Sequence, residues 1–279
     1  MRIGIRAHDM EKAPIETLVE NIRAKGFNCT QLALSKAIHD FNVSKDAMTP
    51  GMALYLKKIF DKNEVDVAVL GCYLNITNPV KEENQEIMEI YKTHIRFASL
   101  LGCGMVGTET GAVNPEYRFE EANHSKEALD SFIEHAKVVV EYAEKMGVIF
   151  GIEPVYSHIV SDIERADKVL RAINSPNLQI ILDPVNLLSI HNHEKHEDII
   201  KGAFQLFKKD IAVIHAKDYI IENNNIKSVP SGQGQLNYNV LLDLIKKEKP
   251  FIHVLLEDTN PTNAISTREF VEQMYEKIV

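Results

Sequence analysis

Four residues of the kind that bind metal ions stand at the ends of four strand-like runs. The runs read IFGIEP, LQIILDP, IAVIHAKD and FIHVLLED, and near their ends lie Glu153, Asp183, His215 and Glu257. A lone acid or histidine at the end of an apolar strand is costly to bury without a partner. Because helix-length segments separate the four runs, we expect the four side chains to meet around one shared cation.

Three carboxylates and one imidazole form a mostly hard ligand set. Such a set suits one divalent ion, with Mn²⁺ favoured and Mg²⁺, Co²⁺ or Zn²⁺ as alternatives. Side chains alternate along a strand, so each ligand is the last or nearly the last residue on the inward face of its strand. A single acid in such a place is more often a helix cap or an ion-pair partner. Four strand ends together, one of them with a histidine, favour a metal site.

Strand and helix patterns alternate from one end of the chain to the other. We expect eight strands within 2–8, 27–34, 65–74, 105–111, 149–154, 178–184, 211–218 and 251–257. Helical runs lie between them, several of them closed by glycine. Eight strand–helix units predict the α/β class and a single (β/α)8 TIM barrel over 1–279, with a doubly wound open sheet as the alternative. Residues 35–48 and 112–124 are irregular, follow strand ends, and are expected to cover the catalytic face.

The composition excludes some partners. The 279 residues carry a formal net charge of −9, which argues against a nucleic-acid partner because polyanions select basic surfaces. Neither a signal-peptide pattern nor a long apolar stretch is present, so we expect no membrane association. Cys29, Cys72 and Cys103 lie in or beside apolar segments without metal-like spacing. They indicate buried thiols in a reducing compartment and a soluble cytoplasmic protein.

The chain resembles the xylose isomerase-like TIM-barrel superfamily, which includes sugar isomerases, epimerases and endonuclease IV. The matching pieces are GIEP (151–154), ILDPVN (181–186), IHAKD (214–218), SGQGQLNY (231–238) and LLED (255–258), in the order of the family. In the ketose 3-epimerase branch the matching positions bind one divalent ion. The resemblance therefore implies Glu153, Asp183, His215 and Glu257 as ligands. It also implies that Glu153 and Glu257 form an acid/base pair.

This implied pair makes chemical sense for proton transfer beside a carbonyl. One carboxylate removes the weakly acidic proton, and a second on the opposite face returns it and inverts the centre. A metal ion stabilises the enediolate formed between these steps. The resemblance thus implies a divalent-metal-dependent isomerase or epimerase of a sugar or sugar phosphate. A homodimer or tetramer is common among such proteins.

Two departures from the epimerase pattern keep other activities open. Asn186 stands where many relatives have a histidine, and Tyr219 and Ile220 follow Asp218 where the epimerases place an arginine nearby. A dehydratase of the inosose or dehydroshikimate type could use the same barrel and metal. A non-catalytic barrel that binds a small ligand is a further alternative. Endonuclease IV is disfavoured because Tyr73 and Asn186 occupy positions where its zinc ions need histidines.

Several other residues are candidates for contact with a carbohydrate substrate. His8 and Tyr73 end the first and third strands, Glu109 ends the fourth, and His158 follows Glu153 by five residues. For each of these a structural hydrogen bond or ion pair is the competing interpretation. We expect these four residues to bind substrate, together with Asn186 and Lys217.

Two further features are interpreted as structural. His191, His193 and His196 lie in SIHNHEKHED, where their spacing is more typical of a solvated helix start than of a metal site. The glycines of SGQGQ, after the seventh strand, could expose amides to a phosphate. A lone GxG is a weak signal of that kind.

Overall fold

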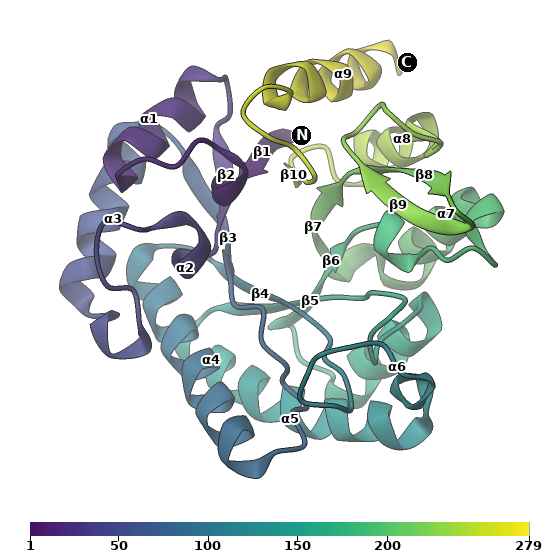
Figure 1. The fold of residues 1–279 in the computed structure, drawn as a ribbon, viewed down its shortest axis with the longest axis horizontal. Helices are drawn as coiled ribbons and strands as arrows, with labels where there is room; N and C mark the ends of the chain where they lie inside the picture. Colours follow the sequence, from purple (N-terminus) through teal and green to yellow (C-terminus); the bar gives the residue numbers. More distant parts are fainter. Residues whose placement is uncertain (279) are drawn as a thin grey trace.

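The computed structural model describes residues 1–278, and its centre is a closed barrel of eight parallel strands (Figure 1). Neighbouring strands follow the order β1-β10-β7-β6-β5-β4-β3-β2. The barrel strands are β1 (Arg2–Arg6), β2 (Cys29–Leu32), β3 (Asp66–Gly71), β4 (Met105–Glu109), β5 (Ile149–Glu153), β6 (Leu178–Leu182), β7 (Ile211–Ala216) and β10 (His253–Leu256). The (β/α)8 prediction is confirmed, with each predicted strand within a few residues of its observed place.

Helices surround the barrel and bury one face against it. They are α1 (Ile15–Ala24), α2 (Leu34–Ala37), α3 (Pro50–Lys62), α4 (Lys81–Leu101), α5 (Lys126–Met146), α6 (Ile163–Ile173), α7 (His196–Phe207), α8 (Tyr238–Glu248) and α9 (Ala264–Lys277). The side chains of Thr49, Ser125 and Asp162 cap the first turns of α3, α5 and α6, which satisfies amides that a helix start leaves free. Within residues 1–278, no helix is long and apolar enough to cross a membrane.

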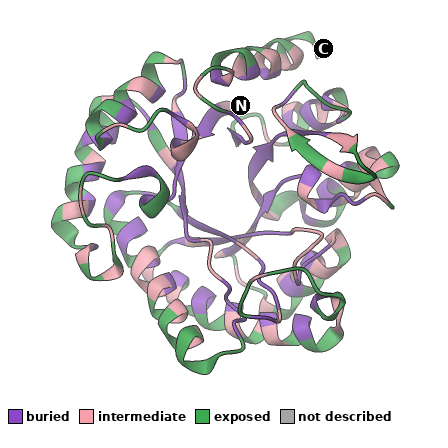
Figure 2. Ribbon diagram, in the orientation of Figure 1, coloured by how far each residue is buried: buried purple, intermediate pink, exposed green. Residues whose placement is uncertain are grey.

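The buried residues form two clusters. The larger one fills the space between the strands and the helices, and the helices turn exposed faces outward (Figure 2). The smaller one lies inside the barrel and contains Cys29, Ala68, Val69, Met105, Ile181, Val213 and Leu255. The interior of a TIM barrel is a packed core rather than a pore. The inner cluster therefore separates the two ends of the barrel.

Two glycines make room for this inner cluster. A Cβ on Gly107 would lie 2.6 Å from Val69 and 2.7 Å from Ile181, and one on Gly151 would lie 2.9 Å from Met105. Such distances are well inside van der Waals contact, so only glycine lets Met105 and Ile181 reach across the barrel. The packing fixes β4 and β5, and β5 ends at Glu153.

A two-stranded antiparallel sheet lies outside the barrel and was not predicted from the sequence. It consists of β8 (Asp218–Glu222) and β9 (Asn225–Val229), directly after β7. Asn223 and Asn224 join the strands with φ values of 51° and 58°, as a two-residue hairpin turn requires. The hairpin projects beside α7 and α8 (Figure 1).

Candidate metal centre

Four side chains converge at the C-terminal end of the barrel. Glu153 ends β5, Asp183 follows β6, His215 lies near the end of β7, and Glu257 follows β10. Each offers one ligand atom, and these atoms all lie within 4.8 Å of one another. All four residues are buried. The structure thus brings together the four residues that the sequence predicted, from four strands that are neighbours in the barrel.

The hydrogen bonds of these four side chains are incomplete. Among residues 1–278, both ring nitrogens of His215 are buried without a hydrogen-bond partner, and Asp183 Oδ2 has an ion pair with Lys217 but no aligned hydrogen bond. His215 Nδ1 lies 3.1 Å from Glu153 Oε2 and 3.3 Å from Glu257 Oε1, but these contacts are not aligned as hydrogen bonds. A buried polar group without a partner costs about 1–3 kcal/mol. Orphaned oxygen and nitrogen atoms in one small space fit a divalent cation.

Charge at the centre is arranged in favour of cations. Burial would lower the pKa of His215, but Glu153 and Glu257 outweigh it and raise the pKa to about 9. Burial raises the pKa of Asp183 to about 6 although the ammonium of Lys217 opposes this. The negative charge of Glu153, Glu257 and Asp183 therefore favours a positive charge on or beside His215. That charge can be a proton on the imidazole or a metal ion that replaces it.

Lys217 is the nearest permanent cation. Its Nζ lies 2.9 Å from Glu257 Oε2 and 3.0 Å from Asp183 Oδ2, and the residue is buried. Burial would lower the pKa of Lys217, but Asp183 and Glu257 hold it well above its usual value. Lys217, predicted from the sequence, therefore contacts two of the four candidate ligand residues directly.

The two glutamates have different partners. Glu153 Oε1 accepts a hydrogen bond of 2.7 Å from the neutral amide of Asn186. Glu257 lies between two cations, with Lys217 Nζ at 2.9 Å from Oε2 and Arg6 Nη1 at 3.3 Å from Oε1. Burial would raise the pKa of Glu257, but Lys217, His215 and Arg6 hold it below its usual value. The predicted Asn186 thus orients a ligand carboxylate.

The other predicted residues surround the centre without joining it. Glu109 ends β4 opposite Glu153 in the β4–β5 pairing, and burial, Glu153 and Glu257 raise its pKa to about 7. His158 Nδ1 lies 3.9 Å from Glu109 Oε2. Burial lowers the pKa of His158 to about 4, so its imidazole is neutral near pH 7. Glu109 and His158 therefore form a pair of polar side chains beside Glu153.

Tyr73 follows β3, and His8 lies in the turn that follows β1, the neighbour of β10. The hydroxyl of Tyr73 accepts a hydrogen bond of 2.6 Å from Gln31 Nε2, and the ammonium of Lys36 lies 5.5 Å from the centre of its ring. Burial, with help from Arg6 and Lys36, lowers the pKa of His8 to about 4. Among residues 1–278, His8 Nδ1 is buried without a hydrogen bond.

Sequence reasoning missed Arg6, Lys36 and Tyr117. Arg6 could have been found from the sequence, since it is a charged residue at the end of an apolar strand, like the four candidate ligands. The sequence around Tyr117 has no comparable pattern. Its ring stacks on His158 at 4.9 Å between centroids, and its hydroxyl lies 3.4 Å from Glu109 Oε2. This position depends on a φ of 56° in the irregular stretch after β4, which tertiary packing imposes.

The two features interpreted as structural have internal partners. The ring of His196 contacts the Tyr219 hydroxyl at 3.2 Å and the Asn237 amide at 3.3 Å. Asp218 accepts hydrogen bonds from the amides of Tyr219, Gly232 and Leu236. The carboxylate of Asp218 therefore already takes the place that a phosphate would occupy on the SGQGQ segment.

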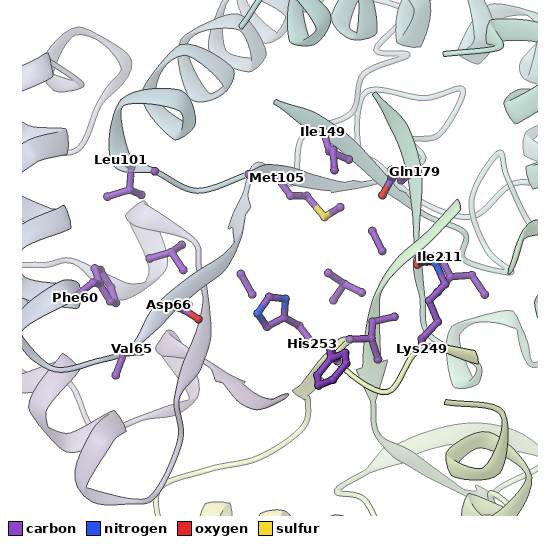
Figure 3. Close-up of a pocket in the computed structure, with 18 of the residues that line it drawn as sticks. Phe60, Val65, Asp66, Leu101, Met105, Ile149, Gln179, Ile211, Lys249 and His253 are labelled. Carbon is purple, nitrogen blue, oxygen red and sulfur yellow. Dashed lines mark hydrogen bonds between the residues drawn. The ribbon is translucent and has the colours of Figure 1, made fainter. Parts of the chain in front are cut away.

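A cavity lies at the opposite, N-terminal end of the barrel (Figure 3). It measures about 770 Å³, and the labelled residues around it include Met105, Ile149, Gln179, Ile211 and His253. Its lining is mixed: Figure 3 shows apolar side chains such as Met105 and Ile149 together with the imidazole of His253, Gln179, Asp66 and Lys249. The cavity and the cluster of candidate metal ligands therefore lie at opposite ends of the barrel. We take the cluster as the candidate site because its residues can bind a metal ion.

Family comparison agrees with the geometry of the barrel. The model of the xylose isomerase-like TIM barrel family matches residues 19–274. This protein belongs to that family. No curated protein sequence matches the xylose isomerase-like barrel described here.

Solved structures resemble this xylose isomerase-like barrel along its whole length. A D-tagatose 3-epimerase-like protein has 19% identity and a TM-score of 0.79, with 100% of this chain and 98% of that chain covered. The IolI protein with a bound zinc atom has 17% identity and a TM-score of 0.75, with coverage of 100% and 99%. The probable 3-DHS dehydratase AsbF from Bacillus anthracis has 13% identity and a TM-score of 0.76, with coverage of 99% and 100%. At these identities the likeness shows the fold alone.

Proposed function

We propose that this protein is a divalent-metal-dependent isomerase or epimerase of a sugar or related polyol. The observation that carries the proposal is the buried cluster of Glu153, Asp183, His215 and Glu257, with ligand atoms within 4.8 Å of one another. Its two glutamates come from β5 and β10, which are three steps apart in the barrel order. Two carboxylates on separate strands can flank a small substrate, as inversion of a carbon centre requires.

The four residues would hold the metal ion, with Mn²⁺ favoured. When bound, a divalent ion supplies positive charge beside the oxygens of a sugar and lowers the energy of negative charge that develops on them. The neighbouring imidazoles and carboxylates supply hydrogen-bond partners for the substrate. His8, Tyr73, Glu109 and His158 lie around the centre and are proposed to bind substrate hydroxyls.

The proton moves between the substrate carbon and the two glutamates. One ionised carboxylate takes the proton from the carbon beside the carbonyl, and the electron pair of the broken C–H bond enters an enediolate. The second glutamate delivers a proton to the opposite face. Asn186 donates a hydrogen bond to the Glu153 carboxylate, and Lys217 donates one to the Glu257 carboxylate. Each carboxylate is therefore held in one orientation.

A panel of sugars and sugar phosphates, assayed with Mn²⁺ in D₂O, tests this proposal. Isomerisation or epimerisation conserves mass and places one solvent deuterium on the inverted or rearranged carbon. Loss of water instead identifies a dehydratase on the same residues. Product without deuterium contradicts proton exchange through a glutamate.

The variant Glu257→Gln tests the acid/base role. We expect turnover to fall by about 10²–10⁴-fold, because a positioned acid/base group contributes that much, while the circular dichroism spectrum stays native. The matched control is His253→Gln, since His253 begins the same strand at the opposite end of the barrel. Wild-type turnover in Glu257→Gln would rule out the two-glutamate mechanism.

The cellular location is a separate proposal. Cys29, Cys72 and Cys103 are all buried as free thiols, as the sequence predicted. Free thiols are typical of reducing compartments. We therefore infer a cytoplasmic enzyme, which localisation by cell fractionation tests.

A further inference from the structure

The barrel closes where β1 pairs with β10. Their register places Ile5 beside Leu256, so the next residues, Arg6 and Glu257, meet at the C-terminal end of this seam. Arg6 Nη1 lies 3.3 Å from Glu257 Oε1. The side chain of Arg6 is mostly buried, with 21% of its area exposed. A ligand carboxylate supplied by one strand is therefore held by a guanidinium from its neighbour.

Arg6 contacts more than one carboxylate. Its Nε donates a hydrogen bond of 2.9 Å to Asp9 Oδ2, and its third nitrogen, Nη2, lies 3.8 Å from Asp258 Oδ1. Asp9 Oδ2 also accepts a hydrogen bond of 3.1 Å from Thr259 Oγ1. The turn Glu257–Thr259 is thus tied to the end of β1 at each of its three residues.

The same turn is conformationally strained. Asp258 has a φ of 54°, a left-handed conformation that residues with a Cβ adopt rarely. Among residues 1–278, its Oδ2 is buried without a hydrogen bond. Strained backbone persists where surrounding contacts hold it in place, often at functional sites. Here the surrounding contacts are those of Arg6 and Asp9.

We propose that Arg6 is a positioning residue that, through its guanidinium fork, fixes the orientation of the Glu257 carboxylate at the metal centre. Lys217 binds Oε2 of this carboxylate and Arg6 lies against Oε1, so neither oxygen can turn away. Because the fork is planar, it can meet Asp9, Glu257 and Asp258 at once, and a lysine cannot. This inference rests on the proposed role of Glu257 as a metal ligand.

A charge-conserving variant separates positioning from simple charge balance. Arg6→Lys keeps the positive charge and loses the fork. We expect its affinity for Mn²⁺, measured by isothermal titration calorimetry on the metal-free full-length protein, to fall about 10–100-fold, as is typical when the partner of a metal ligand is lost. Arg2→Lys is the matched control. It makes the same replacement at the other end of β1, where Arg2 pairs with the exposed Asp66, and should bind Mn²⁺ like the wild type.

The opposite result is equally clear. If Arg6 only balances charge, Arg6→Lys binds Mn²⁺ like the wild type, and Arg6→Met binds it more tightly because a repelling charge is gone. Either result overturns the inference. Thr259→Val provides a second variant that leaves every charge in place and removes the hydroxyl bonded to Asp9. It should weaken Mn²⁺ binding about two- to tenfold, since one hydrogen bond is worth about 0.5–1.5 kcal/mol.

The outcome can be distinguished from failure of the proposed reaction, because these titrations contain no substrate. Weaker Mn²⁺ binding by Arg6→Lys, with full turnover in Glu257→Gln, would leave the positioning role standing and remove the acid/base mechanism. Unchanged Mn²⁺ binding by Arg6→Lys, with loss of turnover in Glu257→Gln, would do the reverse. Melting of each metal-free variant checks that the barrel is folded.

Discussion

The two ends of the barrel are lined by the same four strands, four residues apart. On β5, β6, β7 and β10, the N-terminal positions are Ile149, Gln179, Ile211 and His253, and the C-terminal positions are Glu153, Asp183, His215 and Glu257. The N-terminal positions carry two isoleucines, a glutamine and a histidine, and the C-terminal positions carry three carboxylates and a histidine. The register shifts between β6 and β7, and Ile211 packs in the larger cluster outside the barrel interior.

The difference shows that buried, incompletely bonded charge identifies the site better than volume does. Charged residues at the N-terminal end form exposed pairs, such as Arg2 with Asp66 and Lys57 with Asp61. Exposed pairs contribute little and imply no ligand. At the C-terminal end, Asp183 and His215 are fully buried, and within residues 1–278 Asp183 Oδ2 and both His215 ring nitrogens have no aligned hydrogen bond. There, three carboxylates and a histidine lie close enough together to share one cation.

The largest expected difference between the two ends concerns Lys217 and Lys249. Lys217→Met leaves the buried carboxylates of Asp183 and Glu257 without their cation, so the free energy of unfolding should fall by about 3–5 kcal/mol at neutral pH. Lys249 lies at the N-terminal end and bonds backbone carbonyls of Lys209 and Ile211. Lys249→Met should cost about 1 kcal/mol. Urea unfolding of the metal-free proteins measures both, and equal losses would break the comparison.

A smaller effect is expected from the stabilisation by metal. At a free Mn²⁺ concentration of 100 times Kd, binding to the native state should stabilise the protein by about 2.7 kcal/mol, seen as a higher melting temperature. Asp183→Asn should abolish this increase, and Gln179→Leu, at the other end of β6, should retain it. Retention of the full increase in Asp183→Asn would show that the ion binds elsewhere.

The smallest effect is expected from Asn186. Its side chain holds Glu153 Oε1 at 2.7 Å, so Asn186→Ala should weaken Mn²⁺ binding about tenfold. Asn177→Ala removes the same type of side chain before β6, where Asn177 bonds the carbonyl of Val148. It should leave Mn²⁺ affinity unchanged in calorimetry. Equal losses in both variants would assign the effect to general loosening of β6.

The sequence predicted the barrel and its ligand cluster because both follow local rules. Apolar runs predict strands, and acids or histidine at their ends predict a shared site once the barrel is assumed. The β8–β9 hairpin escaped because its strands are partly polar and lie outside the barrel core, although Asn223-Asn224 is a typical hairpin turn. Tyr117 and Asp258 owe their positions to positive φ angles that distant contacts impose. A local sequence pattern does not predict contacts between residues that are distant in the sequence.

The seam between β1 and β10 also bears on how the centre comes into being. Gly4 pairs with Leu255, so nearly the whole sequence lies between partners that must meet before Arg6 reaches Glu257. Pairings of such high sequence separation form late in folding because loop closure opposes them. The contact of Arg6 with a metal-bound Glu257 would therefore form only when the barrel closes. Metal binding should therefore slow unfolding and leave the rate of folding almost unchanged.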